Sequence, residues 1–314
     1  MFNNTDKILI AGGSGFIGRH LANRCSEYTP HITCLGLTGN YRGQQKSRNM
    51  RFIQADIRNK RQLKSALRNK SFDYVFNLGG YIDHTPYLED GRKIIESHFT
   101  GLMNLIDCLD VKKLKGFVQT GSSDEYGNAP APQQEGMREK PISPYSFAKT
   151  ASSHFIQMLS NTEGFPGVVL RLFLVYGPMQ DGKRFLPHII KACLKNCSFK
   201  ISEGKQLRDF CYVEDVVEAL IKAAVLPSAK GHIINVASGA PVSIRQVTEK
   251  VVRLTGGGRP LWGAHQYRKG ENMALYADIS LAKNLLKWEP KVTFEKGLKE
   301  TIEHYKSFLK GAKL

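Results

Sequence analysis

The chain has 314 residues, of which 41% are hydrophobic and 23% are charged, and its formal net charge is +17. This length is roughly two domains' worth of chain, and it supplies a sizeable core without disulfides or metals. The composition excludes disordered, collagen-like and coiled-coil proteins. The positive charge suits anionic partners, but it does not choose between phosphates, nucleic acid and a membrane surface.

No stretch approaches the roughly 20 apolar residues that span a bilayer, so membrane insertion is not expected. The first residues do not resemble a secretory signal peptide, because no separate apolar segment and cleavage site precede the glycine-rich turn at residues 12–18. The six cysteines match no zinc or redox spacing, and we expect no metal site. These features favour a cytoplasmic protein with reduced cysteines.

Short apolar runs rich in β-branched residues alternate with helical patterns up to about residue 175. Because strands that alternate with helices form right-handed βαβ units, the sequence predicts an α/β fold with a Rossmann-type, doubly wound parallel sheet. The expected strands cover 7–11, 31–37, 50–55, 74–78, 116–120, 167–175 and 232–236, and expected helices include 17–28, 94–109, 213–226 and 243–254.

The spacing of these elements loosens after residue 175, where loops rich in Gly, Lys and Arg follow. We therefore place an NAD(P)-binding domain at residues 1–177 and a smaller substrate-binding lobe at residues 178–314. Residues 232–238 are expected to return to the main sheet.

A basic run over residues 58–70 holds six Lys or Arg and no acid. Leu63 and Leu67 within it are spaced i, i+4, which predicts an amphipathic helix with a solvated basic face. No nucleic-acid module accompanies the run, so we expect no nucleic-acid partner.

A glycine-rich turn follows the first expected strand, with Gly12, Gly15 and Gly18 in a G-x-x-G-x-x-G pattern. Glycines let the backbone approach a pyrophosphate, and the start of the next helix, at Phe16 and Ile17, offers free N–H groups. At the opening of a βαβ unit, this pattern predicts a dinucleotide site rather than an ordinary turn.

The end of the second expected strand bears on the type of cofactor. An acid that binds the adenosine ribose is usual there in NAD sites, but residues 34–42 contain none. Arg42 is placed to meet a 2′-phosphate, which favours NADP, with NAD as the alternative.

A Tyr-x-x-x-Lys pair lies at the start of another predicted helix. Ser143 is a suitable cap and Pro144 suits the first helical position, which puts Tyr145 and Lys149 on one face. An ammonium beside a phenol is expected to lower the tyrosine pKa and make Tyr145 a usable proton donor or acceptor.

With these motifs in this order, the chain resembles the extended short-chain dehydrogenase/reductase superfamily, in its branch of NAD(P)-dependent epimerases, dehydratases and reductases of nucleotide sugars. The resemblance covers nearly the whole chain. It implies that Asp56 and Ile57 meet the adenine, and that Leu78 and Gly79, in a turn like the family's Asn-Leu-Ala-Ala, lie beside the cofactor.

The same resemblance implies roles around the sugar. Ser122 is at the family's catalytic Ser/Thr position, with Ser123 next to it, and Asp124 is where 4,6-dehydratases carry a glutamate base. The arginines of Arg208-Asp209-Phe210 and Arg268-Lys269-Gly270-Glu271 are implied to grip the nucleotide diphosphate. The implied partners are a nucleoside-diphosphate sugar and a second copy of the chain, paired through helices at 94–109 and 145–159.

Two positions depart from the family pattern. Leu174 replaces an asparagine that contacts substrate, which argues against an ordinary 4-epimerase, and His98 stands where many members have asparagine. Asp124 is shorter than the dehydratase glutamate and lacks an acidic neighbour at Ser123. The sequence therefore favours a C4 reductase of a 4-keto-6-deoxyhexose, with a 4,6-dehydratase or 4-epimerase as the alternative, and it leaves the nucleotide and sugar open.

Overall fold

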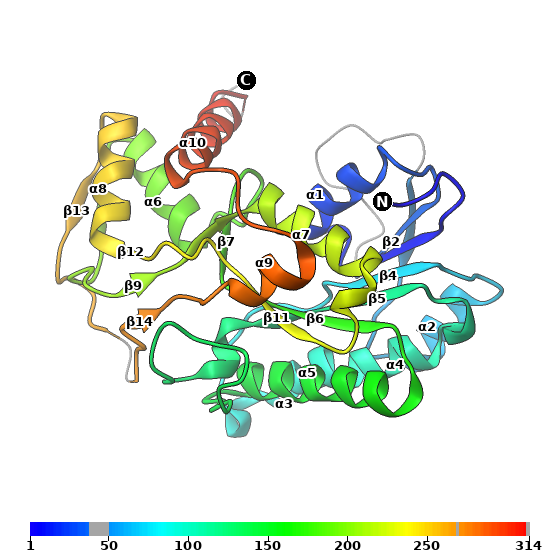
Figure 1. Ribbon diagram of the computed structural model, residues 1–314. Helices are drawn as coiled ribbons and strands as arrows, with labels where there is room; N and C mark the ends of the chain where they lie inside the picture. Colours follow the sequence, from blue (N-terminus) through cyan, green and yellow to red (C-terminus); the bar gives the residue numbers. More distant parts are fainter. Residues whose placement is uncertain (38–49, 268–269, 312–314) are drawn as a thin grey trace.

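The computed structural model describes residues 1–37, 50–267 and 270–311, and within these it forms a seven-stranded parallel sheet (Figure 1). Its strand order is β11-β6-β5-β4-β1-β2-β3, which confirms the expected doubly wound α/β fold. In chain order the strands are β1 (Ile8–Ala11), β2 (Ile32–Gly36), β3 (Met50–Gln54), β4 (Tyr74–Asn77), β5 (Gly116–Ser122), β6 (Gly167–Leu172) and β11 (Ile233–Val236).

Helices cover both faces of this sheet, as Figure 1 shows. On one face α1 (Phe16–Cys25) packs against α7 (Val213–Val225), around Leu21 and Val216. On the other face Leu63, Leu105 and Ile156 belong to a second apolar cluster. The helices there are α2 (Lys60–Leu67), α3 (Arg92–Ile95), α4 (Gly101–Asp107) and α5 (Pro144–Glu163).

The segment that was expected to form one regular helix over 94–109 is interrupted. A π-helical turn, Glu96–Thr100, joins α3 to α4. The carbonyl of His98 inside this turn accepts a 3.3 Å hydrogen bond from the Ser152 hydroxyl on α5, a contact that hydrophobic spacing does not reveal. Such π turns occur frequently at functional sites.

The run expected as one strand over 167–175 is two strands in different sheets. After β6 ends, the amide of Phe173 still donates to the carbonyl of Val236, the last residue of β11, but the amide of Leu174 donates to the carbonyl of Asp209. The next strand, β7 (Leu174–Tyr176), therefore pairs with β10 (Phe210–Tyr212). This change of partner starts the C-terminal lobe.

An apolar cluster that includes Tyr176, Phe199, Val247 and Leu298 forms the core of that lobe. Strand β11 lies outside it and pairs with β6 in the main sheet, while the boundary at residue 177 remains a prediction. The remaining elements are β8 (Ser198–Lys200), β9 (Leu207–Arg208), β12 (Val242–Ser243), β13 (Arg259–Leu261), β14 (Ala274–Leu275), α6 (Phe185–Leu194), α8 (Ile244–Thr255), α9 (Ser280–Leu286) and α10 (Phe294–Gly311).

The described residues also contain short 3₁₀ turns: η1 (Tyr87–Glu89), η3 (Val111–Lys113), η4 (Ser123–Tyr126) and η5 (Pro227–Ala229). Among the helices of the described residues, none is long and apolar enough to cross a bilayer.

A fully buried ion pair joins β6 to η4, the turn that follows β5. Arg171 on β6 donates through Nε to Glu125 at 2.8 Å, and both side chains have no exposed surface. The guanidinium also binds Glu139 and lies 4.7 Å from the ring centroid of Tyr126. Burial by itself lowers the pKa of Arg171, but Glu125 and its other partners outweigh burial and raise it, so this arginine is charged.

Removing this cation should destabilise the fold strongly. In Arg171→Met the buried carboxylate of Glu125 and the partly buried carboxylate of Glu139 lose their partner, and we expect the free energy of unfolding to fall by about 3–5 kcal/mol, measured by urea denaturation. The control Arg92→Met removes an exposed i, i+4 pair with Glu96 and should change little. A fall below about 1 kcal/mol for Arg171→Met would contradict the role given to the pair.

Candidate active site

The predicted site residues gather at the carboxyl ends of the parallel strands. Strands β1 and β4 are neighbours in the sheet although β2 and β3 lie between them in the chain, so the strand order reverses there. Ligands of open α/β sheets bind in the crevice at such a reversal. The turns after both strands, and Ser122 at the end of β5, lie on this edge.

The glycine turn packs its backbone against the turn that follows β4. Gly12 has φ +79°, and a Cβ there would lie 2.7 Å from the carbonyl oxygen of Leu78. A Cβ on Gly18 would lie 2.2 Å from the carbonyl oxygen of Gly12. The sequence therefore needs glycine at both positions to bring the start of α1 close to the turn at Leu78 and Gly79.

The backbone at this turn fits a dinucleotide. Gly15 precedes α1, and within the described residues no side chain caps that helix, which leaves the N–H groups of Phe16 and Ile17 for an external acceptor. Free amides and the positive end of the helix suit a pyrophosphate. Ile57, expected near the adenine, packs beside Gly79 and Gly101, where an added Cβ would lie 3.1 Å and 2.8 Å from its Cδ1.

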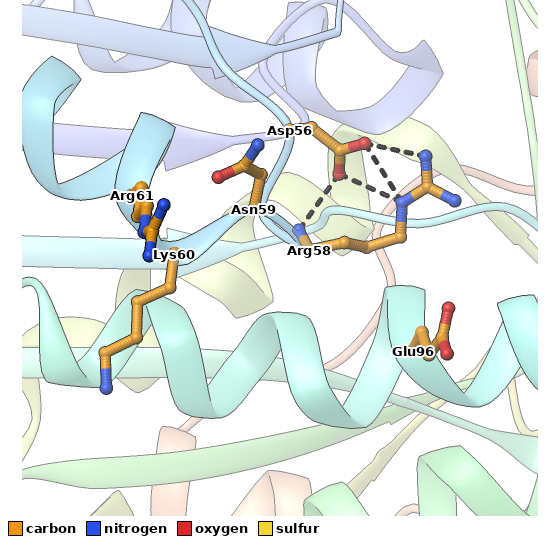
Figure 2. Close-up of a pocket in the computed structure, with 6 residues that line it drawn as sticks. All are labelled: Asp56, Arg58, Asn59, Lys60, Arg61 and Glu96. Atoms are coloured by element: carbon orange, nitrogen blue, oxygen red, sulfur yellow. Dashed lines mark hydrogen bonds and ion pairs between the residues drawn. The ribbon is translucent and has the colours of Figure 1, made fainter.

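The region predicted to meet the adenine contains an ion pair that the sequence did not predict. Arg58 donates to both carboxylate oxygens of Asp56 and binds Oδ2 through Nη2 at 2.6 Å (Figure 2). This pairing with Arg58 lowers the pKa of Asp56. The two residues line an open hollow together with Asn59, Lys60, Arg61 and Glu96. The Asp56 carboxylate expected to meet the adenine is therefore engaged by Arg58.

Tyr145 and Lys149 lie on one face of α5, as expected from their spacing. The Ser143 hydroxyl caps this helix by accepting from the Ser146 amide at 3.1 Å. Both functional side chains are only 4% exposed, and the Lys149 Nζ lies 5.8 Å from the ring centroid of Tyr145. The ammonium donates to the carbonyl of Thr120 on β5 at 2.8 Å.

The expected lowering of the Tyr145 pKa by Lys149 is not what the geometry produces. Burial raises the pKa of Tyr145, the Asp124 carboxylate raises it further, and a hydrogen bond with the Ser122 side chain lowers it only in part. Lys149 directs its ammonium to the Thr120 carbonyl, and burial lowers the pKa of this lysine to about 8. Desolvation outweighs the attraction that the i, i+4 spacing suggested.

The predicted Ser122, Ser123 and Asp124 form the end of β5 and the start of η4. The Ser122 hydroxyl accepts from the Asp124 amide at 3.2 Å, and the Ser122 amide donates to Glu125 at 2.8 Å. Asp124 is partly exposed and lies 3.6 Å from the Nε2 of His84. The ring of His84 is in turn 5.7 Å from that of Tyr145, so a carboxylate and an imidazole flank the phenol.

Arg208 lies in the C-terminal lobe, where its side chain is held by the chain itself. One guanidinium nitrogen donates to the carbonyls of Leu207 and Asn272, and the other binds Glu271. The structure thus joins the two basic motifs through an ion pair. Its proposed diphosphate role remains a prediction, and Arg42 and Arg268 lie outside the described residues.

Comparisons with known proteins identify the family. The model of the "NAD dependent epimerase/dehydratase family" matches residues 8–237. The chain belongs to this family. It is 32% identical to UDP-glucuronate 4-epimerase from Thermodesulfobacterium geofontis over 261 residues, 82% of this chain and 80% of that protein. It is 26% identical to human dTDP-D-glucose 4,6-dehydratase over 316 residues, 96% of this chain and 90% of that protein.

A solved structure of the family extends the comparison to three dimensions. A mutant UDP-glucuronic acid 4-epimerase from Bacillus cereus, in complex with UDP-4-deoxy-4-fluoro-glucuronic acid and NAD, superposes with a TM-score of 0.86. Its sequence is 26% identical, and the match covers 96% of this chain and 99% of that one. The family fold therefore extends over nearly the whole chain, including the C-terminal lobe.

Several residues in and around the candidate active site of this chain were not predicted from the sequence. Glu125 and Glu139 hold Arg171, and His84 lies beside Asp124. An arginine in the middle of an apolar strand was the available signal, because a buried guanidinium requires buried carboxylates. Nothing in the local sequence indicates the position of His84, which depends on the course of the loop after β4.

The buried ammonium should leave a mark on the pH dependence of stability. Lys149 binds its proton less tightly in the folded chain, with a pKa of about 8 against 10.5, so the parent protein gains stability as pH rises between these values. Lys149→Met lacks this gain. We expect its free energy of unfolding, relative to the parent, to fall between pH 8 and pH 10 in urea titrations. A pH-independent difference would contradict a depressed pKa.

Proposed function

We propose that this protein is a nucleotide-sugar 4-epimerase that recycles a bound NAD. The observation that carries the proposal is the buried group of Tyr145, Ser122 and Lys149 at the strand ends, in a chain 32% identical to a UDP-glucuronate 4-epimerase. This replaces the reductase expected from the sequence, and it sets aside the argument from Leu174 against a 4-epimerase, because the relatives cited above are named as 4-epimerases and a 4,6-dehydratase.

The chain's own residues supply binding and proton transfer. The amides of Phe16 and Ile17 hold the pyrophosphate, and Lys149 holds the adjacent ribose. When bound, the cofactor would supply a reversible acceptor for the hydride at C4 of the sugar. Tyr145 takes the proton of the C4 hydroxyl and gives it back, while Ser122 hydrogen-bonds the same oxygen and Asp124 orients the sugar. Arg208 contributes to binding of the diphosphate.

A 4,6-dehydratase is the second candidate, and the position of Asp124 favours it. That activity needs a base for the C5 proton after oxidation at C4. The Asp124 carboxylate acts electrostatically on the Tyr145 phenol, whose pKa it raises, and its side chain is partly exposed.

We also propose a homodimer, built on α5 and the helical segment from α3 to α4. Phe147 and Met158 on α5 are 50% and 42% exposed, and Leu88 just before α3 is 94% exposed. Apolar side chains of this size suit a protein interface.

Substitutions at Tyr145 and Asp124 distinguish the two enzyme candidates. Tyr145→Phe should reduce kcat by ~10²–10⁴-fold, because a positioned proton carrier is lost. Asp124→Asn should cost far less in an epimerase, but as much as Tyr145→Phe in a dehydratase. The assay supplies UDP- and dTDP-linked hexoses and hexuronic acids to each variant, and the products are analysed by NMR and mass spectrometry.

The products and a control complete this test. An epimerase forms the C4 epimer of unchanged mass without net absorbance change at the reduced-nicotinamide band, whereas a dehydratase product has lost water. The control Tyr87→Phe changes an exposed tyrosine and should retain activity. Net consumption of reduced nicotinamide with a 4-keto sugar would overturn both candidates and restore the reductase.

The cofactor preference is tested by direct binding. We expect NAD⁺ to bind more tightly than NADP⁺ in calorimetric titrations, and Arg42→Ala to leave the affinity for NAD⁺ unchanged. Tighter binding of NADP⁺ that disappears in Arg42→Ala would instead support the cofactor expected from the sequence.

A further inference from the structure

The side chain of His98 is buried beside the candidate catalytic residues but is only half satisfied. It is 4% exposed, and its ring centroid lies 5.1 Å from that of Tyr145. Its Nε2 is 2.8 Å from the carbonyl oxygen of Tyr81. Its Nδ1, in contrast, has no hydrogen-bond partner within the described part of the chain. Buried polar atoms nearly always have partners, so this one needs an explanation.

The protonation state of the ring follows from its surroundings. A carbonyl oxygen only accepts hydrogen bonds, so Nε2 carries the proton. Burial first, and then the charge of Lys149, lower the pKa of His98 to about 3 against the opposing effect of the Tyr81 carbonyl. The imidazole is therefore neutral at physiological pH. Nδ1 presents a lone pair, and its missing partner must be a donor.

The ring faces the turn that follows β4. Gly80 in this turn has φ +115°, and a Cβ there would lie 2.2 Å from Cε1 and 2.6 Å from Nδ1 of His98. The glycine thus leaves the space that the imidazole fills. Gly80 and His98, which departs from the asparagine of the family pattern, meet at this point in the structure. Gly80 makes room for the imidazole, and His98 supplies the acceptor Nδ1.

The donor is not a neighbouring side chain. Lys149, whose charge acts on His98, directs its ammonium to the Thr120 carbonyl. Tyr145 hydrogen-bonds with Ser122 and meets the imidazole through its ring, at an interplanar angle of 82°. The acceptor therefore lies among Tyr145, Lys149 and the β4 turn, on the edge of the sheet where the proposed cofactor binds.

We propose that His98 is a positioning residue for the cofactor, whose Nδ1 accepts a hydrogen bond from a hydroxyl group of the ribose beside Lys149. This inference rests on the cofactor part of the proposed function. It is independent of whether the sugar is epimerised or dehydrated. The ribose then contacts an acceptor, Nδ1 of His98, and a cation, the Lys149 ammonium. These two contacts fix the position of the ribose relative to Tyr145.

Two substitutions separate the two ring nitrogens. The amide of His98→Asn lies near the position of Nδ1 and retains an acceptor there, whereas the longer His98→Gln reaches the position of Nε2 and retains only the contact with Tyr81. The probes are NAD⁺, ADP-ribose, which carries the second ribose, and ADP, which lacks it. Affinities are measured by calorimetry on the full chain, with thermal unfolding as a check on the fold.

We expect His98→Gln to weaken binding of NAD⁺ and ADP-ribose by about three- to tenfold, the usual effect of one hydrogen bond, and to leave ADP unchanged. His98→Asn should stay within about twofold of the parent. The control His31→Gln changes an exposed histidine at the start of β2 and should match the parent for all three probes. Equal losses in both His98 variants, or an equal loss for ADP, would overturn the proposal.

A measurement on the parent protein does not depend on the folding of any variant. With ¹⁵N-labelled histidine, the resonance of the unprotonated Nδ1 should move upfield on addition of NAD⁺ or ADP-ribose, but not of ADP. A resonance that NAD⁺ does not move assigns the donor to a water and overturns the proposal. If the parent does not bind NAD⁺, the cofactor assignment is overturned as well. If the parent binds NAD⁺ but the two His98 variants have equal affinities for it, this inference alone is overturned.

Discussion

The candidate active site depends on one constraint, the buried ion pair between Arg171 and Glu125. Two charges without exposed surface depend on further hydrogen bonds to offset the loss of water around them. Glu125 also accepts from the Ser122 amide and from the Ser153 hydroxyl on α5. A single carboxylate therefore links the ends of β5 and β6 to the helix that carries Tyr145. The relative position of Ser122 and Tyr145 follows from this link.

The same region shows how desolvation, more than charge pairing, sets the electrostatics of the site. Tyr145, Lys149 and His98 are all buried, and burial is the leading cause of the pKa shift of each. Each group is therefore biased towards its neutral form. A site of this kind provides hydrogen-bonding groups of low charge that respond to what binds beside them, because a ligand's charge is little screened there. Asp124, at the exposed rim, is the contrasting carboxylate.

The C-terminal lobe is tied to the sheet by a second set of buried polar contacts. Asp209, which follows β9, accepts from the amides of Ser238 and Gly239 just after β11. Next to it, Arg208 binds Glu271 in the loop before β14. These contacts bring the two motifs that the sequence resemblance assigned to the nucleotide diphosphate into one place. They also show that arginine in such a motif has a structural function in addition to any contact with phosphate.

The features that the sequence by itself determined depend on short-range rules. The glycine turn at residues 12–18 follows from steric limits on a few backbone atoms, and the start of α5 follows from Ser143 and Pro144. The alternation of apolar runs predicts the parallel sheet because each strand and helix carries its own periodicity. These signals act within one element or one turn, so they can be recognised without knowledge of the rest of the chain.

Only the tertiary structure decided how distant residues meet. The direction of the Tyr145 pKa shift, the partners of Arg171 and the unsatisfied Nδ1 of His98 each depend on several elements at once. The run at 167–175 divides into two strands because the backbone partner changes from β11 to the residues before β10. Burial and cross-element hydrogen bonds belong to no single segment, which is the physical reason why local patterns do not reveal them.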